Sequence, residues 1–140
     1  MRKRTKAREC VLKILYQAEI TRRKITVAAP FFWEDHPKKD DIIKDFAGAL
    51  LDGIEKNIDV IDEKITQYAT NWQIKRMAVI DRNILRLGVY EILFTSDIPP
   101  KVTINEAVEL AKKYGDPESS KFVNGILDKI HKTEPLKKDA

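Results

Sequence analysis

The chain has 140 residues, of which 43% are hydrophobic and 34% are charged, and its net charge is +4. This composition is typical of a globular protein with one buried core, and no apolar run approaches the roughly 20 residues that span a bilayer, which excludes a membrane protein. The basic start is not followed by the apolar run of a secretory signal, and the single Cys10 cannot form an internal disulfide, so we expect a cytoplasmic protein.

The charge is unevenly distributed along the chain. Residues 1–24 hold nine Lys or Arg against two Glu, a net charge of +7, whereas the remaining residues have a net charge of −3. A basic arm on a mildly acidic body indicates a site for a polyanion. A solvated terminus that only aids solubility would have the same composition, so charge alone leaves both interpretations open.

Helical periodicity begins near residue 5, where Thr5 is placed to cap a helix. One apolar stripe consists of Ala7, Val11, Ile14, Leu15 and Ala18, and a second, roughly opposite, consists of Leu12, Tyr16 and Ile20. A helix with two apolar faces lies between two layers or offers one face to a partner. Tyr16 is therefore either buried against another helix or an aromatic platform for a nucleic-acid base.

Residues 24–41 contain two prolines, an aromatic cluster and no clear period, which predicts a loop. The cluster is Phe31, Phe32 and Trp33, and we expect it to fold back onto the bundle as a lid rather than to form an exposed stacking patch. Helical periodicity resumes in residues 43–54, and another helix is expected to begin at Asp59.

The second half, from residue 71, is centred on one strongly apolar segment. Apolar residues cover nearly the whole circumference of residues 80–94, which predicts the buried centre of a bundle. Glu91 lies among them, and a buried carboxylate needs a cation or several donors, so we expect Glu91 to be paired for structural reasons. Pro99 and Pro100 end this helix.

The end of the chain carries several helix-boundary signals. Thr103 and Glu106 have the spacing of a capping box, and Gly115 is expected to end that helix in the left-handed conformation. Asp116 and Pro117 are expected to begin the last helix as its cap and first residue. No segment predicts a strand. We therefore expect an all-α fold of about seven helices in two small bundles, residues 1–70 and 71–140, within one compact domain.

The last helix has an unusual outer face. In residues 119–130, SSKFVNGILDKI, the residues Asn124 and Gly125 fall off the apolar stripe. Glycine in a helix interior costs about 1 kcal/mol relative to alanine. Either the position is simply tolerated, or something outside comes close to the backbone.

The sequence shows no catalytic or metal-binding pattern. His36 and His131 have no ligand-type residue at metal-binding spacing, and neither a Gly-rich phosphate loop nor a nucleophile elbow is present. We therefore expect a protein that is not an enzyme and that needs neither a cofactor nor a metal.

Three long motifs follow one another in the second half: WQIKRMAVIDRNILRLGVYEILF from Trp72, PPKVTINEAVELAKKYG from Pro99 and SSKFVNGILDKI from Ser119. In order and spacing they resemble the NusB family of bacterial transcription antitermination factors, and the first helix, RECVLKILYQAEI from Arg8, is similar as well. The resemblance covers nearly the whole chain except residues 24–41. It implies two helical bundles with the first helix between them.

The resemblance also implies a function. Family members pair with NusE, a ribosomal protein of the small subunit, and the pair binds the boxA element of ribosomal RNA leader transcripts and loads an antitermination complex on RNA polymerase. The implied RNA-binding residues are Arg2, Lys3, Arg4, Arg8, Lys121, Phe122 and Asn124, with Tyr16 close by. The cations would hold phosphates, Asn124 would read a base edge, and Phe122 or Tyr16 would stack, although Phe122 also fits the core. Asp81 and Glu118 match the places where the family binds NusE.

Two other functions fit the same residues. One is an accessory RNA-binding domain or subunit of a ribosomal RNA methyltransferase, although the chain has no cofactor-binding βαβ unit. The other is a protein-only adaptor that does not touch RNA. The sequence leaves open which RNA is preferred and whether the free protein is a monomer or a homodimer.

Overall fold

The computed structural model describes residues 2–70 and 73–135. Within these ranges the chain forms seven α-helices, one short 3-10 helix and no strand, which confirms the predicted all-α fold. The elements are α1 (Lys3–Thr21), α2 (Ile25–Glu34), α3 (Asp41–Lys56), α4 (Ile58–Tyr68), η1 (Ile74–Arg76), α5 (Val79–Phe94), α6 (Pro100–Tyr114) and α7 (Ser119–Thr133).

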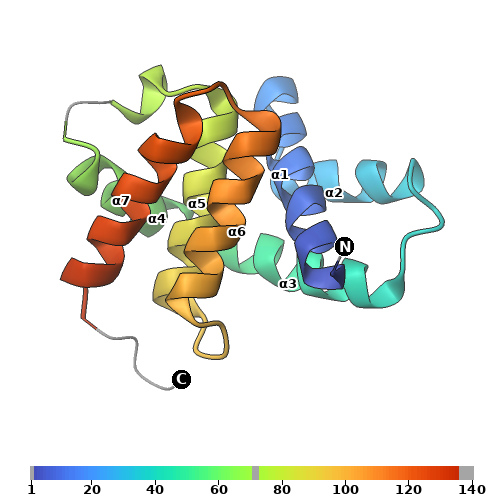
Figure 1. Cartoon of the computed structure of the whole chain (residues 1–140). Coiled ribbons are helices and arrows are strands. Elements are labelled where there is room, and N and C mark those ends of the chain that lie inside the picture. Colours follow the sequence, from blue (N-terminus) through green and yellow to red (C-terminus); the bar gives the residue numbers. More distant parts are fainter. Residues whose placement is uncertain (1, 71–72, 136–140) are drawn as a thin grey trace.

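The helices form two groups that share α1 and α5 (Figure 1). Helix α1 packs against α2, α3 and α5, while α5 packs against α1, α3, α4, α6 and α7. Helix α4 packs mainly on α5 and α7, so it lies with the second group although it precedes residue 71 in the chain. The predicted boundary after residue 70 adjoins residues 71–72, which lie outside the described residues.

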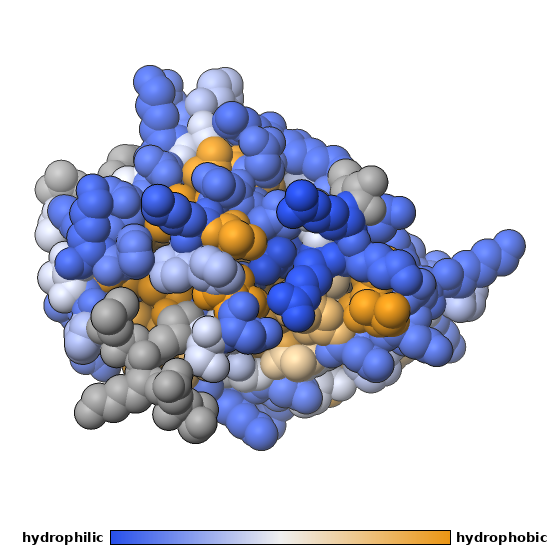
Figure 2. All heavy atoms as spheres, turned by 60° about the horizontal axis from the view of Figure 1, so that its bottom comes forward, coloured by the Kyte–Doolittle hydropathy of each residue, from blue (hydrophilic) through white to orange (hydrophobic). Residues whose placement is uncertain are grey.

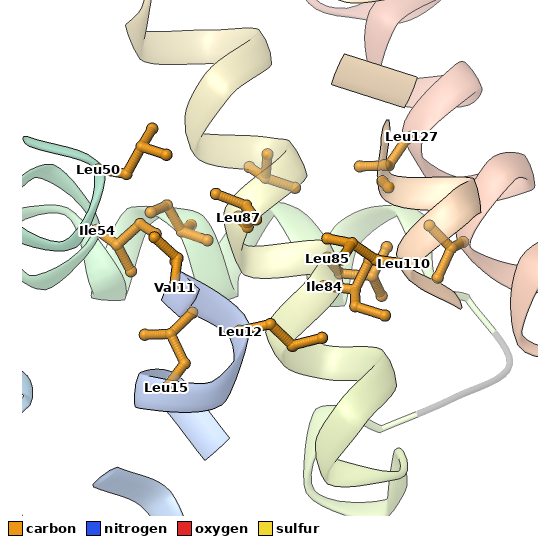
Figure 3. Packing of buried hydrophobic residues seen from close by; sticks show 14 of the residues in the cluster. Val11, Leu12, Leu15, Leu50, Ile54, Ile84, Leu85, Leu87, Leu110 and Leu127 are labelled. Atoms are coloured by element: carbon orange, nitrogen blue, oxygen red, sulfur yellow. The ribbon is translucent and has the colours of Figure 1, made fainter. Parts of the chain in front are cut away.

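Helix α1 is buried on two faces, as its two apolar stripes predict. Val11 and Leu15 point toward Ile54 of α3, whereas Leu12 points toward Ile84 of α5 (Figure 3). All five of these side chains are buried. The second stripe is buried only at its start, because Tyr16 and Ile20 farther along α1 are exposed.

The predicted loop at residues 24–41 is wrong, because residues 25–34 form α2. Ala28 and Phe32, one turn apart, are buried against the core, so a helical period exists there that the prolines conceal. Pro30 is exposed, and so is Thr26, the residue whose carbonyl loses its amide partner to the proline. The expected aromatic lid is right for Phe32 and Trp33, which pack on the core, but Phe31 is exposed.

Three predicted helix boundaries are also wrong. Helix α1 begins at Lys3, before Thr5, and α6 begins at Pro100 in place of Thr103, because a proline is preorganised for the first turn of a helix. Gly115 ends α6 in an extended conformation (φ −92°, ψ −173°) rather than the left-handed one.

The last helix begins two residues later than predicted. Helix α7 starts at Ser119, and Pro117 lies in the turn before it. Asp116 still acts as a cap, since its carboxylate accepts a hydrogen bond of 2.9 Å from the backbone N–H of Glu118. The aspartate therefore caps this short turn instead of the helix proper.

Candidate RNA and partner interface

A buried ion-pair network joins α1 to α5 and α6. The Arg8 guanidinium donates from Nε and Nη2 to the two carboxylate oxygens of Glu91, at 2.7 and 2.9 Å. Its Nη1 donates to Glu106 at 3.1 Å. The hydroxyls of Thr103 and Thr5 donate to Glu91 at 2.8 Å and to Glu106 at 2.6 Å. Both threonines and Glu106 therefore serve this network, and none of them caps a helix, because α1 and α6 begin before Thr5 and Thr103.

This network confirms that Glu91 is paired and changes the role expected of Arg8. Arg8 is 3% exposed, and each of its guanidinium nitrogens donates to a carboxylate. Burial acts to lower the pKa of Arg8, but hydrogen bonds and charge attraction from Glu91 and Glu106 outweigh it and raise the pKa above its ordinary value. The interpretation of Arg8 as a phosphate contact is therefore a wrong prediction: its donors are inside the protein.

The other cations at the start of α1 lie on the surface. Lys3 pairs with Asp40 at 2.9 Å, and Arg4 lies 3.7 Å from Asp97 and 4.5 Å from the ring centre of Phe46. The hydrogen bond from Lys3 and the backbone N–H of Ile42 lower the pKa of the Asp40 carboxyl. Exposed ion pairs of this kind contribute little to stability, so Lys3 and Arg4 can exchange these partners for phosphates at small cost.

A hollow of about 580 Å³ lies between the segment before α5, the first turn of α5 and the start of α7. We name it the α5–α7 hollow, and its lining residues are Arg76, Met77, Ala78, Asp81, Asp116, Glu118, Ser119, Lys121 and Phe122. It brings the two residues expected to bind a protein, Asp81 and Glu118, beside two residues expected to bind RNA. Arg76 is a further cation that the sequence analysis missed, and the neighbouring pair of Lys75 and Arg76 was the available signal.

Asp81 is a buried carboxylate of this hollow that lacks a hydrogen-bond partner on one oxygen among the residues that the structure describes. Its side chain is 9% exposed, and its Oδ1 has no hydrogen-bond partner in the described part of the chain. Burial raises the pKa of the Asp81 carboxyl, a hydrogen bond with Ser119 opposes that rise, and the charge of Asp116 adds to it. An unsatisfied buried acceptor costs about 1–3 kcal/mol, which a donor from a binding partner would recover.

The first turns of α7 present an open surface. Lys121, Asn124 and Gly125 are exposed, whereas Phe122 is half-buried, packs on the core and also borders the α5–α7 hollow. A Cβ atom built at Gly125 meets no atom within 4 Å. Packing against a neighbouring helix therefore does not explain this glycine, and the space above it is free.

Tyr16 lies in the second half of α1, away from the first residues of the helix. It is 41% exposed and borders a second hollow of about 370 Å³, which we name the Tyr16 hollow. The lining residues of this hollow are Leu12, Lys13, Tyr16, Gln17, Phe32, Asp35, His36, Ile80 and Tyr114. Ile80 borders the Tyr16 hollow and the adjacent Asp81 borders the α5–α7 hollow, so the two hollows flank the start of α5.

The structure does not bring the start of α1 and the start of α7 together. Thr5 contacts Glu106 and Glu9 contacts Lys113, so α1 and α6 run in the same direction and the start of α7 follows the far end of α6 (Figure 1). Figure 2 turns the lower face of Figure 1 toward the reader, and mainly hydrophilic side chains with separate apolar patches cover this face. The expected RNA-binding residues therefore form two separate sites, one at each end of the molecule.

Two further properties concern the described residues only. No group of three or more His, Cys, Asp or Glu side chains in residues 2–70 and 73–135 is arranged to hold a metal ion. None of the helices in the described part of the chain combines the length and the apolar character that crossing a membrane requires.

Comparison with known proteins identifies the family. A model of the NusB family matches residues 5–132. The chain belongs to the NusB family. The transcription antitermination protein NusB of Thermodesulfovibrio yellowstonii is 48% identical over 141 aligned positions, which cover 94% of this chain and 93% of the relative. The NusB protein of Pseudothermotoga lettingae is 44% identical over 135 positions, with 95% and 94% covered.

Solved structures of the family have the same fold. The structure of T. maritima NusB matches with a TM-score of 0.84 and 41% identity, over 93% of this chain and 91% of that one. A NusB chain from a structure of antitermination factors NusB and NusE in complex with dsRNA matches with a TM-score of 0.85 and 32% identity, over 94% and 98% of the two chains. The resemblance inferred from the three motifs is thus confirmed.

Proposed function

We propose that this chain is a transcription antitermination factor that pairs with NusE and, with it, binds boxA-type single-stranded RNA in nascent ribosomal leader transcripts. In this role it acts in the cytoplasm as a scaffold of the complex on RNA polymerase and catalyses no reaction. The observation that carries the proposal is the α5–α7 hollow. Its lining includes Asp81 and Glu118, which were expected to bind NusE, and Lys121 and Phe122, which were expected to bind RNA. The solved relative in complex with NusE and double-stranded RNA supports NusE and RNA as the two kinds of partner.

The partner protein is proposed to bind at the start of α5. Asp81 offers an unsatisfied buried acceptor, and Glu118 adds an exposed carboxylate at the rim of the same hollow. Ribosomal proteins are commonly basic, so carboxylates on this side favour their approach. We assign Tyr16 to the protein side as well, because its hollow is lined mostly by apolar and aromatic side chains next to Ile80.

RNA is proposed to bind at the first turns of α7. Lys121 and Arg76 supply cations for phosphates, and Asn124 has both a donor and an acceptor for a base edge. The half-buried ring of Phe122, at the border of the hollow, is proposed to stack on a base, and the bare backbone at Gly125 lets the strand approach closely. Arg2, Lys3 and Arg4 at the other end of α1 form a second, purely electrostatic contact.

A titration tests the proposal. A fluorescent boxA strand, a scrambled strand of the same length and the boxA duplex are titrated with this protein in the presence and absence of NusE. We expect the boxA single strand with NusE to bind most tightly. Equal affinity for the boxA and scrambled strands would contradict specific recognition and leave only attraction between a polyanion and cations.

The same titration separates the other candidates. Association with NusE without any RNA binding would identify a protein-only adaptor, and RNA binding that is independent of NusE would favour an accessory RNA-binding subunit. Sedimentation of the free protein distinguishes a monomer from a homodimer.

A further inference from the structure

The carboxylate of Glu19, in the last turn of α1, collects three donors from α5. Arg82 donates to one of its oxygens, and Arg86 and Asn83 donate to the other at 2.9 and 3.3 Å. The side chains of Glu19, Arg82 and Arg86 are only 24%, 16% and 17% exposed. Such a half-buried cluster of charge-assisted bonds holds its members in defined positions.

Arg82 also binds the backbone of the segment that precedes α5. Its Nη1 donates to the carbonyl oxygens of Ile74, at 3.1 Å, and Met77, at 3.0 Å. A single guanidinium thus joins the end of α1 to residues 74–77. Arg86, bound to the same carboxylate, directs its other donors to Asp62 of α4 and to Asn83 instead.

Residues 74–77 depend on this contact more than a helix would. The segment has one 3-10 turn, with backbone bonds from Arg76 to Gln73 at 2.9 Å and from Met77 to Ile74 at 3.3 Å. The same segment supplies Arg76, Met77 and then Ala78 to the wall of the α5–α7 hollow. The bonds from Arg82 to the carbonyls of Ile74 and Met77 therefore fix the position of that wall.

We infer that Arg82, oriented by Glu19, is a positioning residue: by binding the carbonyls of Ile74 and Met77, it fixes the position of the segment that forms one wall of the α5–α7 hollow. The inference rests on the proposed function, because the hollow is the proposed binding site for NusE and RNA. Arg82 itself is not among the residues that line this hollow, so it acts only through residues 74–77. The planar fork of arginine is required, since a lysine ammonium cannot hold Glu19 and two carbonyls in one plane.

Two matched variants test the inference. Arg82→Lys keeps the charge beside Glu19 but gives up the bonds to Ile74 and Met77. Arg86→Lys makes the same chemical change beside the same carboxylate and touches no carbonyl of the segment. For each, we measure the melting temperature, hydrogen–deuterium exchange in a peptide that spans residues 73–78, and the affinity for NusE.

The two variants are expected to differ in amide exchange and in NusE affinity. Arg82→Lys should speed amide exchange in residues 73–78 and weaken NusE association by about tenfold, the equivalent of one lost charge-assisted hydrogen bond. Arg86→Lys should lower the melting temperature about as much as Arg82→Lys does. It should leave amide exchange in residues 73–78 and NusE affinity within about twofold of the unchanged protein. Equal effects of the two variants on amide exchange and on NusE affinity, or unchanged exchange in Arg82→Lys, would overturn the inference.

Failure of the proposed function has a different signature. If the unchanged protein does not bind NusE, the proposed function is wrong, and amide exchange alone then decides whether Arg82 holds the segment. Faster exchange in Arg82→Lys but not in Arg86→Lys supports that role, and equal exchange in both contradicts it.

Discussion

Replacing Arg8 by methionine separates a structural arginine from an RNA-binding one. Arg8→Met keeps a long apolar side chain of similar length but removes the three donors that Glu91 and Glu106 receive. Glu91 is 1% exposed, so its charge would remain buried without the guanidinium, although the Thr103 hydroxyl still donates to it. The variant is therefore expected to unfold far more easily than the parent protein.

The size of the effect follows from the burial of the pair. Breaking a buried ion pair by removing one partner costs about 3–5 kcal/mol. For a domain of this size, each kcal/mol lowers the melting temperature by about 3–5 °C, so Arg8→Met should melt on the order of 10–20 °C lower. The double variant Arg8→Met with Glu91→Gln removes both charges and should recover part of this loss, because no unpaired charge then stays inside.

The assay combines thermal melting by circular dichroism with RNA binding at several salt concentrations below the melting temperature. Arg4→Met is the matched control, because Arg4 belongs to the same arm and its side chain is 54% exposed. It should leave the melting temperature nearly unchanged and reduce the salt slope of RNA binding by about 0.7, the value for one phosphate on a single strand. Arg8→Met should leave that slope unchanged.

The opposite pattern would refute this reasoning. If Arg8→Met melts like the parent protein and reduces the salt slope, Arg8 is a phosphate contact in solution and the buried pair with Glu91 is not the source of its importance.

Three further predictions concern glycines and a buried carboxylate. Gly125→Leu should leave the melting temperature unchanged or raise it slightly, because leucine favours a helix more than glycine does and no atom lies within 4 Å of the added Cβ, and it should weaken RNA binding in the titration with NusE; unchanged RNA affinity would show that the bare backbone has no role. Gly53→Ala should cost about 1–3 kcal/mol in urea unfolding, since a Cβ there would overlap the ring of Tyr90, whereas Gly48→Ala, with no atom within 4 Å, should gain about 0.5–1 kcal/mol. Burial raises the pKa of Asp81, so ionising this carboxyl lowers the free energy of unfolding. This loss is absent below the pKa of the unfolded state and is complete once the pH has risen through the pKa of the folded state. Asp81→Asn should therefore raise the melting temperature at about pH 7 and lose this gain near pH 3, and a gain of equal size at both pH values would contradict it.

Much of the fold could be predicted because helical periodicity is local. The buried position of α5 and the two faces of α1 follow from apolar residues that recur within a few turns, and the structure confirms both. The prediction failed in residues 24–41, where Pro30 suggested a break. A proline on the exposed side of a helix loses only one bond that water can replace, and no local pattern reveals which side is exposed.

The candidate site was predicted by residue type and not by arrangement. Asp81, Glu118, Lys121 and Phe122 were expected to serve two different partners, and the structure places them around one hollow. Arg76 completes that hollow but carries no signal beyond its charge. Arg2, Lys3 and Arg4 were expected to bind the same RNA as Lys121 and Asn124, yet the direction of α1 relative to α6 puts the start of α1 and the start of α7 at opposite ends.

The sequence by itself determined the helical class of this protein, its basic arm, the need of Glu91 for a partner and the likeness to the NusB family. All of these depend on composition, period or ordered motifs along the chain. Only the tertiary structure decided that the partner is Arg8, 83 positions away, and that the space above Gly125 is open. Pairing and exposure depend on which distant segments pack together, and side-chain chemistry at one position does not specify its neighbours in space.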